Sequence, residues 1–212
     1  MADCSGPKPR KIVFFGDSIT ELGVQPDGYV TLIAREIRQQ FPKRDINIIG
    51  AGISGNKVPD LQARLEQDVL SIKPDIVIIY IGINDVWHSI LPGHTGTSPE
   101  NFRSGLLQLI RRLQDGGVQI VLCTPSVIGE KRDNQNPLDP PLDRYADIIR
   151  QLAATENLPL IDLRRQFKAY LSANNPENLE QNILTYDGVH LNRRGNQFVA
   201  AVMLKTLTGI LH

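Results

Sequence analysis

Three polar side chains in this sequence have the types needed to transfer an acyl group: Ser18, Asp187 and His190. A serine hydroxyl is a weak nucleophile at its ordinary pKa, so it needs an imidazole within hydrogen-bonding reach to take its proton. A carboxylate must then hold the other ring nitrogen and fix the tautomer. Asp187 stands only three positions before His190, which favours their pairing. We expect Ser18 to be the nucleophile, His190 the base and Asp187 the residue that orients it.

Acyl transfer also needs N–H groups already aimed at the oxygen that gains negative charge, because preformed donors stabilise that charge without reorganisation. The sequence offers the backbone N–H groups of Ser18 and Gly55 and the side-chain amide of Asn84. Glycine at position 55 lets the backbone approach a substrate with no side chain in the way. We predict an oxyanion hole formed by Ser18, Gly55 and Asn84.

The elements that must position these residues alternate along the chain. Short runs rich in β-branched residues alternate with longer stretches of helical period, which is typical of an α/β domain built on a parallel sheet. Most of the runs are apolar on both faces, as expected when helices cover both sides of a sheet. The predicted strands span residues 11–15, 46–50, 75–81, 119–124 and 158–162.

Apolar residues at helical spacing mark the segments between these strands. Ser98 followed by Pro99 predicts the start of one helix, because serine caps a helix and proline suits its first position. We expect a single domain over residues 1–212, with residues 1–10 as a flexible N-terminal tail. The apolar helical faces lie within residues 29–37, 58–72 and 102–113, and the last helix begins near residue 192.

The candidate residues stand where predicted strands end or just before the last helix. Ser18 follows the first strand, Gly55 the second and Asn84 the third, whereas Asp187 and His190 precede the last helix. In an open parallel sheet the carboxyl ends of the strands share one edge, where ligands bind. We therefore expect all five residues to converge at that edge.

Four short motifs follow one another in this arrangement. They read Gly-Asp-Ser-Ile at 16–19, Gly-Ile-Ser-Gly-Asn at 52–56, Gly-Ile-Asn-Asp at 82–85 and Asp-Gly-Val-His at 187–190. Their order resembles that of the SGNH hydrolases, also called the GDSL esterase and lipase family, over nearly the whole chain. The resemblance implies a three-layer α/β/α sandwich whose five-stranded parallel sheet has flavodoxin-like strand order. It also implies ester hydrolysis without a metal or an organic cofactor.

The sequence departs from the family pattern at two points. Ile19 stands where the family name has leucine, and Ala51 precedes Gly52 where many relatives have asparagine or arginine. The second departure could alter how the loop after the second strand is pinned, but it leaves Gly55 in place.

Each candidate also has a plainer structural interpretation. Ser18 could cap a turn or belong to a phosphate-binding loop, since flavodoxin-like domains hold anions after their first strand. Asn84 and Asp85 could be turn formers, and His190 could be an ordinary turn histidine. Ser54 is a rival nucleophile, but its surroundings lack the Gly-x-Ser-x-Gly spacing. With all four motifs present, we favour the catalytic interpretation.

Two Gly- and Pro-rich segments, 82–99 and 125–141, are predicted to be long loops at the same sheet edge. Polar residues from Glu130 to Asn136 could contact a carbohydrate there. Dispersed histidines and carboxylates show no tight ligand spacing, so we expect no metal site.

Asp17, Trp87 and His88 are possible substrate-pocket residues, because they adjoin the first and third motifs. Trp87, with Ile90 and Leu91, could accept an acyl chain. Alternatively, Trp87 and His88 anchor a loop, and Asp17 bonds nearby backbone.

The composition limits the partners of the chain. Lys+Arg 23 balances Asp+Glu 23, so no net field favours nucleic acid or an anionic membrane. The longest apolar run, residues 76–83, is too short for stable membrane insertion, and the N-terminus lacks a signal-peptide core, so we expect a cytoplasmic protein. Only two cysteines are present, Cys4 and Cys123, and this small number argues against a disulfide framework.

These observations predict a serine hydrolase that cleaves carboxylic esters of a small-molecule substrate through an acyl-enzyme on Ser18. Esters with short acyl chains and acetylated sugars are both open as substrates. The alternatives are a catalytically silent module that binds a glycan or an anion, and a flavodoxin-like nucleotide protein. The sequence gives no prediction of the oligomeric state.

Overall fold

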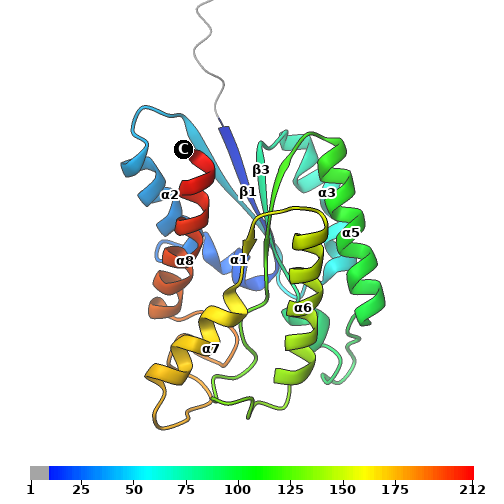
Figure 1. Cartoon of the computed structure of the whole chain (residues 1–212), viewed down its shortest axis with the longest axis vertical. Coiled ribbons are helices and arrows are strands. Elements are labelled where there is room, and N and C mark those ends of the chain that lie inside the picture. The colour runs from blue at the N-terminus through cyan, green and yellow to red at the C-terminus, as the bar shows by residue number, and fades with distance from the viewer. Residues whose placement is uncertain (1–9) are drawn as a thin grey trace, which may run out of the picture.

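A five-stranded parallel sheet lies at the centre of the molecule and is covered by helices on both faces (Figure 1). The computed structural model describes residues 10–212, so Cys4 and most of the predicted tail lie outside the described residues. Arg10, predicted as the last residue of that tail, is instead the first residue of β1. The strand order is β2-β1-β3-β4-β5, which confirms the flavodoxin-like order.

The strands coincide closely with the predicted apolar runs. The last one is shorter than the predicted 158–162, because the Leu158 N–H bonds Ala153 O of the preceding helix and Pro159 has no N–H to donate. The strands are β1 (Arg10–Gly16), β2 (Ile46–Gly52), β3 (Ile76–Tyr80), β4 (Gln119–Cys123) and β5 (Leu160–Ile161).

The helices form one layer on each side of the sheet. In Figure 1, α2 and α8 lie on one side and α3 and α5 on the other, while α6 packs beside α5 and α7 contacts α8. The helices are α1 (Ser18–Gly23), α2 (Tyr29–Gln40), α3 (Val58–Asp68), η1 (Leu70–Ile72), α4 (Ile83–Trp87), α5 (Pro99–Asp115), α6 (Asp139–Thr155), α7 (Leu163–Asn174) and α8 (Arg193–Leu211).

Burial of apolar side chains between these layers holds the sheet rigid. Every residue of β3 is buried, because helices cover both of its faces. Leu61 of α3 and Leu106 of α5 are each 0% exposed. Burying one such side chain contributes roughly 1.5–3 kcal/mol, so the core gives the strand ends a fixed geometry.

Two predicted loops differ from the structure. The segment 82–99 contains the short helix α4, and the segment 125–141 ends inside α6, whose first turn carries Pro140 and Pro141. The apolar spacing used above predicts neither α6 nor α7. Within residues 10–212, no helix has the length and apolar character that a bilayer crossing requires.

Candidate active site

Ser18, His190 and Asp187 form a continuous hydrogen-bonded chain at the carboxyl edge of the sheet. Ser18 Oγ lies 2.9 Å from His190 Nε2, and His190 Nδ1 lies 2.6 Å from Asp187 Oδ2. With the ring proton on Nδ1, facing the carboxylate, Nε2 is free to accept from the serine hydroxyl. The structure thus brings together the three residues that the sequence singles out.

The turn from β1 into α1 presents Ser18 at the strand end. Asp17 is the N-cap of α1, and its Oδ1 accepts a hydrogen bond of 3.0 Å from the Ile19 N–H. At Gly16, a Cβ atom would lie 2.4 Å from both Thr20 Oγ1 and Tyr80 O, so only glycine fits where the chain turns. Ser18 therefore begins the helix with its side chain 8% exposed, directed at His190.

A tight turn carries the other two residues. Asp187 Oδ1 accepts hydrogen bonds from the backbone N–H groups of Val189, at 3.0 Å, and His190, at 2.7 Å. Burial alone would raise the pKa of Asp187, but these bonds and the His190 ring outweigh it and lower the pKa below its usual range. Asp187 is therefore a carboxylate that can stabilise an imidazolium at neutral pH.

The three predicted oxyanion donors follow β1, β2 and β3: Ser18 is the first residue of α1, Gly55 lies in the loop after β2, and Asn84 lies in α4. Gly55 has φ +79°, a conformation that favours glycine, and among residues 10–212 its N–H has no hydrogen-bond acceptor. Asn84 is 4% exposed, and its Nδ2 donates to Asn56 O at 3.1 Å, which leaves the second N–H of the amide available. The Ser18 N–H opens α1 and has no partner within the helix.

Arg64 of α3 pins the loop that carries Gly55, and the sequence analysis does not single it out. Its guanidinium donates to Gly16 O at 2.8 Å, Ala51 O at 3.0 Å and Asn56 Oδ1 at 2.6 Å, and it lies over the Phe15 ring. One cation thus ties the ends of β1 and β2 to the loop. Arg64 therefore holds the loop that carries Gly55 in place, although Ala51 stands where many relatives have asparagine or arginine.

Burial and hydrogen bonding correct the sequence interpretation of Asp17 and agree with the low weight given to Ser54 as a nucleophile. Asp17, a possible pocket residue, is 2% exposed and caps α1, so it does not line a pocket and its plainer interpretation holds. Burial raises the pKa of Asp17 to about 7, against the Ile19 hydrogen bond, and the nearby Asp85 adds to the rise. Ser54, the rival nucleophile, donates to the Glu21 carboxylate.

A cleft of about 280 Å³ opens beside Asp187. Its lining includes Trp87 and Ile90 and the exposed polar residues Glu180 and Gln181. Trp87 is half-buried, so it lines the cleft as one sequence interpretation predicts.

His88 lies beside Gly55, where its Cε1 would be 3.8 Å from a Cβ atom added to that glycine. Its ring packs on His94 with centroids 4.7 Å apart. Burial, with His94 and Lys57, lowers the pKa of His88. Within residues 10–212, no group of three His, Cys, Asp or Glu side chains is placed to hold a metal ion.

The polar loop from Glu130 to Asn136 does not present its two end residues to a carbohydrate, as the sequence suggests it could. Glu130 is 0% exposed and Asn136 is 4% exposed. The Glu130 side chain accepts from the backbone of residues 183–185, and the Asn136 side chain bonds the backbone of Lys131 within the same loop.

Residues 14–198 match the family described as GDSL-like lipase/acylhydrolase. The chain belongs to that family. It is accordingly a carboxylic ester hydrolase, which confirms the resemblance inferred from the four motifs and does not favour the silent binding module.

Three comparisons show how similar its acylhydrolase relatives are. The crystal structure of the acetyl xylan esterase AlAXEase has a TM-score of 0.89 and 47% identity, covering 92% of this chain and 98% of that one. The acetylxylan esterase of Geobacillus stearothermophilus is 31% identical, covering 93% of this chain and 94% of the relative. A catalytic mutant of that enzyme, with a serine replaced by alanine, gives a TM-score of 0.83 at 29% identity, with coverage of 93% and 94%.

Proposed function

We propose that this acylhydrolase removes acetyl groups from acetylated sugars through an acetyl-enzyme on Ser18. The observation that carries the proposal is the 2.9 Å contact between Ser18 Oγ and His190 Nε2, backed by Asp187. The sugar substrate is supported by the two acetylxylan esterases that resemble the chain over nearly its whole length.

In the first step, Ser18 Oγ attacks the carbonyl carbon of the acetyl ester while its proton moves to His190 Nε2. The imidazolium that results is stabilised by the Asp187 carboxylate at Nδ1. The carbonyl π electrons move to the oxygen, which takes a negative charge in a tetrahedral intermediate.

The negatively charged oxygen accepts hydrogen bonds from the backbone N–H groups of Ser18 and Gly55 and from the side-chain amide of Asn84. These donors are held in place before the reaction, so they stabilise the oxyanion without reorganising. The intermediate collapses when its C–O bond to the sugar breaks, and the leaving sugar oxygen takes the proton from His190 Nε2. The acetyl group then remains on Ser18.

Water completes the cycle by the same route. His190 takes a proton from the water while the water oxygen attacks the acetyl carbonyl, and the oxyanion again faces the same donors. Collapse returns the proton to Ser18 Oγ and releases acetate. No redox partner enters either step.

The cleft beside Asp187 suits a sugar that carries a small acyl group. Trp87 offers an aromatic face, and Glu180 and Gln181 offer hydrogen-bonding groups at the rim. Specificity in such sites comes from a few placed polar groups on an apolar wall. A long acyl chain would need an extended apolar channel, whereas the residues that line this cleft include the polar Asn136, Glu180 and Gln181.

The substrate is tested by comparing acetylated xylo-oligosaccharides with p-nitrophenyl esters of two to twelve carbons. We expect kcat/KM to be highest for the acetylated sugar and to fall steadily as the acyl chain lengthens. An optimum at long chains would contradict the acetyl specificity. A preference for p-nitrophenyl acetate over every sugar ester would favour an arylesterase such as the Vibrio mimicus relative, which is 28% identical over 72% of this chain and 70% of its own length.

The nucleophile is tested by a matched pair of serine variants. Ser18→Ala should lower kcat by about ten-thousand-fold or more, because the acyl-enzyme cannot form. Ser54→Ala should stay close to the parent activity, since the Glu21 carboxylate still accepts from the Ser54 backbone N–H. Full activity in Ser18→Ala, with circular dichroism unchanged, would refute the proposed mechanism.

A further inference from the structure

Glu130 is a fully buried carboxylate outside the three residues that react. Its Oε1 accepts hydrogen bonds from the N–H groups of Leu184, at 2.6 Å, and Thr185, at 2.8 Å. Its Oε2 accepts from the Ile183 N–H at 2.7 Å. Three consecutive backbone N–H groups, none of them in a helix or a strand, are thus held by one side chain that is 0% exposed.

The segment that Glu130 holds leads directly into the turn with Asp187 and His190. Thr185 pairs with Leu191 in an isolated antiparallel bridge, and the Thr185 hydroxyl accepts from the Gly188 N–H at 3.1 Å. These contacts close residues 185–191 into one small unit. Any shift at 183–185 therefore moves the aspartate and the histidine together.

The loop around Glu130 is itself anchored to the rest of the fold. Asn175 Nδ2 donates to Glu130 O at 2.8 Å, the Glu130 N–H donates to Glu180 O, and the Gly129 N–H donates to Gly188 O. Residues 129–130 are thus bonded to Glu180, which precedes the segment, and to Gly188, which lies within the turn. These bonds fix the position of the turn with Asp187 and His190 relative to β4 and α7.

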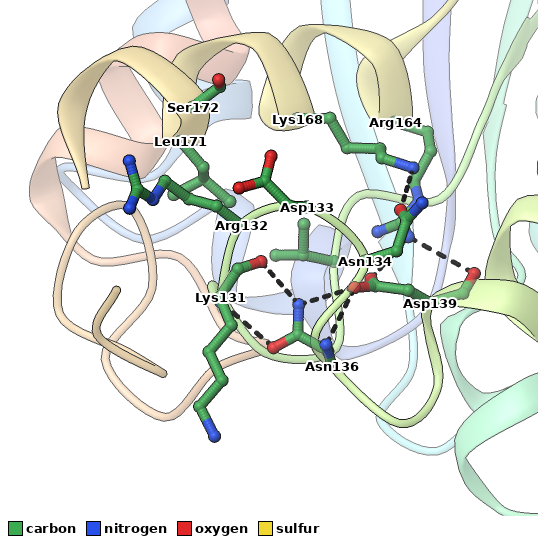
Figure 2. Close-up of a pocket in the computed structure, with 11 residues that line it drawn as sticks. Lys131, Arg132, Asp133, Asn134, Asn136, Asp139, Arg164, Lys168, Leu171 and Ser172 are labelled. Carbon is green, nitrogen blue, oxygen red and sulfur yellow. Dashed lines mark hydrogen bonds and ion pairs between the residues drawn. The ribbon is translucent and has the colours of Figure 1, made fainter. Parts of the chain in front are cut away.

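A polar network holds the backbone of Lys131, the residue that follows Glu130 (Figure 2). Asn136 bonds the backbone of Lys131 through both Oδ1 and Nδ2, and its Nδ2 also donates to Asp139 at 2.9 Å. Asp139 in turn accepts from Arg164 of α7 at 2.6 Å. In Figure 2, Lys131 and Asn136 on the loop and Arg164 on α7 line a cavity of about 210 Å³ that lies between the loop and the helix.

We infer that Glu130 is a positioning residue for catalysis: by holding the N–H groups of residues 183–185 it sets the distance from His190 to Ser18. The inference rests on the proposed roles of Ser18, Asp187 and His190. A catalytic group displaced by about 1 Å can cost on the order of 100-fold in rate, so a rigid support for the turn has a direct effect on kcat. Glu130 touches neither substrate nor reacting atoms.

The chemistry of the contact requires a carboxylate. Three N–H donors need acceptors on both side-chain oxygens, and bonds to an ionised acceptor are about twice as strong as neutral ones. Glutamine has the same shape but presents an NH₂ group at one of the two positions. That group would face an N–H of the segment, so one contact becomes repulsive while packing is retained.

The test is Glu130→Gln in the full chain, measured with a fluorophosphonate probe and with p-nitrophenyl acetate. The end-point fraction of labelled Ser18 counts folded sites, and kcat is expressed per labelled site. We expect near-complete labelling, kcat lower by about 10- to 100-fold and KM changed by less than about three-fold. Glu177→Gln, which changes an exposed carboxylate in the segment after α7, is the matched control and should match the parent.

A second measurement separates positioning from stability alone. In the Asp187→Asn background, Glu130→Gln should cost much less than in the parent, because both changes act through the placement of His190. Equal losses in the two backgrounds, an unchanged kcat per labelled site, or a loss only in proportion to the labelled fraction would each overturn the inference. Where Glu130→Gln does not fold, Glu130→Asp carries the same test, since it withdraws both oxygens by one methylene.

The two proposals fail in distinguishable ways. A parent protein whose Ser18 is not labelled, or a fully active Ser18→Ala, removes the proposed mechanism and this inference with it. An inactive Ser18→Ala beside a fully active Glu130→Gln removes the positioning role alone.

Discussion

Ser18 and His190 stand 172 positions apart in the chain, yet Ser18 Oγ and His190 Nε2 lie 2.9 Å apart. The sheet brings them together, because β1 lies between β2 and β3 and delivers Ser18 to the carboxyl edge of the sheet. A side-chain contact completes the approach: Asn196 Oδ1 of α8 accepts from the Tyr29 N–H of α2 at 2.9 Å. The helix that follows His190 is thus fixed to the helix that follows the turn of Ser18.

Asn84→Ala tests the oxyanion hole. Removing one preformed donor should lower kcat by about 100- to 1,000-fold and leave KM nearly unchanged, because the amide acts on the charge that develops only in the transition state. Steady-state kinetics on acetylated xylo-oligosaccharide and on p-nitrophenyl acetate measure both constants. Asn101→Ala, at an exposed position of α5, is the matched control. A rise in KM at constant kcat would instead assign Asn84 to substrate binding.

Arg64→Met tests the cation that joins the two strand ends. Methionine keeps packing on Phe15 but removes the guanidinium hydrogen bonds to Gly16 O, Ala51 O and Asn56 Oδ1, which should lower the free energy of unfolding by about 2–4 kcal/mol. We also expect a lower kcat, since the loop with Gly55 loses its support. Urea unfolding and kinetics measure the two effects.

The control for that change is Arg111→Met. Arg111 is 64% exposed and faces Glu156 across 3.7 Å, so its loss should cost less than about 1 kcal/mol. An equal loss of stability in both variants would show that Arg64 acts only as a surface charge.

The sheet and the reacting residues could be predicted from the sequence because their signals are local. Strands buried on both faces form continuous apolar runs, as at residues 76–80, and each motif follows such a run directly. Parallel pairing then requires that Ser18, Gly55 and Asn84 meet at one edge. α6 could also have been found, since Leu142, Tyr145, Ile149 and Leu152 have helical spacing.

No local sequence pattern predicts the contacts of Glu130 and Arg64, the two residues that hold the active-site loops in place. Glu130 stands in a Gly- and Pro-rich stretch and looks solvated, because its partners Ile183 to Thr185 lie more than fifty positions away. Arg64 stands on a helix where charged residues usually face water, and only the packing of α3 beside the sheet turns it inward. Long-range burial of a charge depends on the tertiary fold, which no pattern in the sequence encodes on its own.

Asp17→Asn tests the pH dependence of stability. Burial raises the folded-state pKa of Asp17 from 3.8 to about 7, so between these values the folded chain binds a proton that the unfolded chain releases. The contribution of protonated Asp17 to the free energy of unfolding is therefore fully present below pH 3.8. It is lost as the pH rises towards 7. Asparagine keeps an oxygen for the Ile19 N–H and carries no charge, so the variant escapes this loss.

We expect the stability of Asp17→Asn relative to the parent to rise between pH 5 and pH 8, by about 2–3 kcal/mol, since the slope is about 1.4 kcal/mol per pH unit up to the folded pKa. Urea unfolding of both proteins at the two pH values measures it, and Asp27→Asn, at an exposed position, is the matched control. Asp85, whose pKa burial raises to about 6, is present in all three proteins, and its interaction with Asp17 is part of the difference that Asp17→Asn measures. A difference between Asp17→Asn and the parent that is the same at both pH values would mean that the carboxyl beside the nucleophile is ionised in the folded state, as it is in the unfolded one.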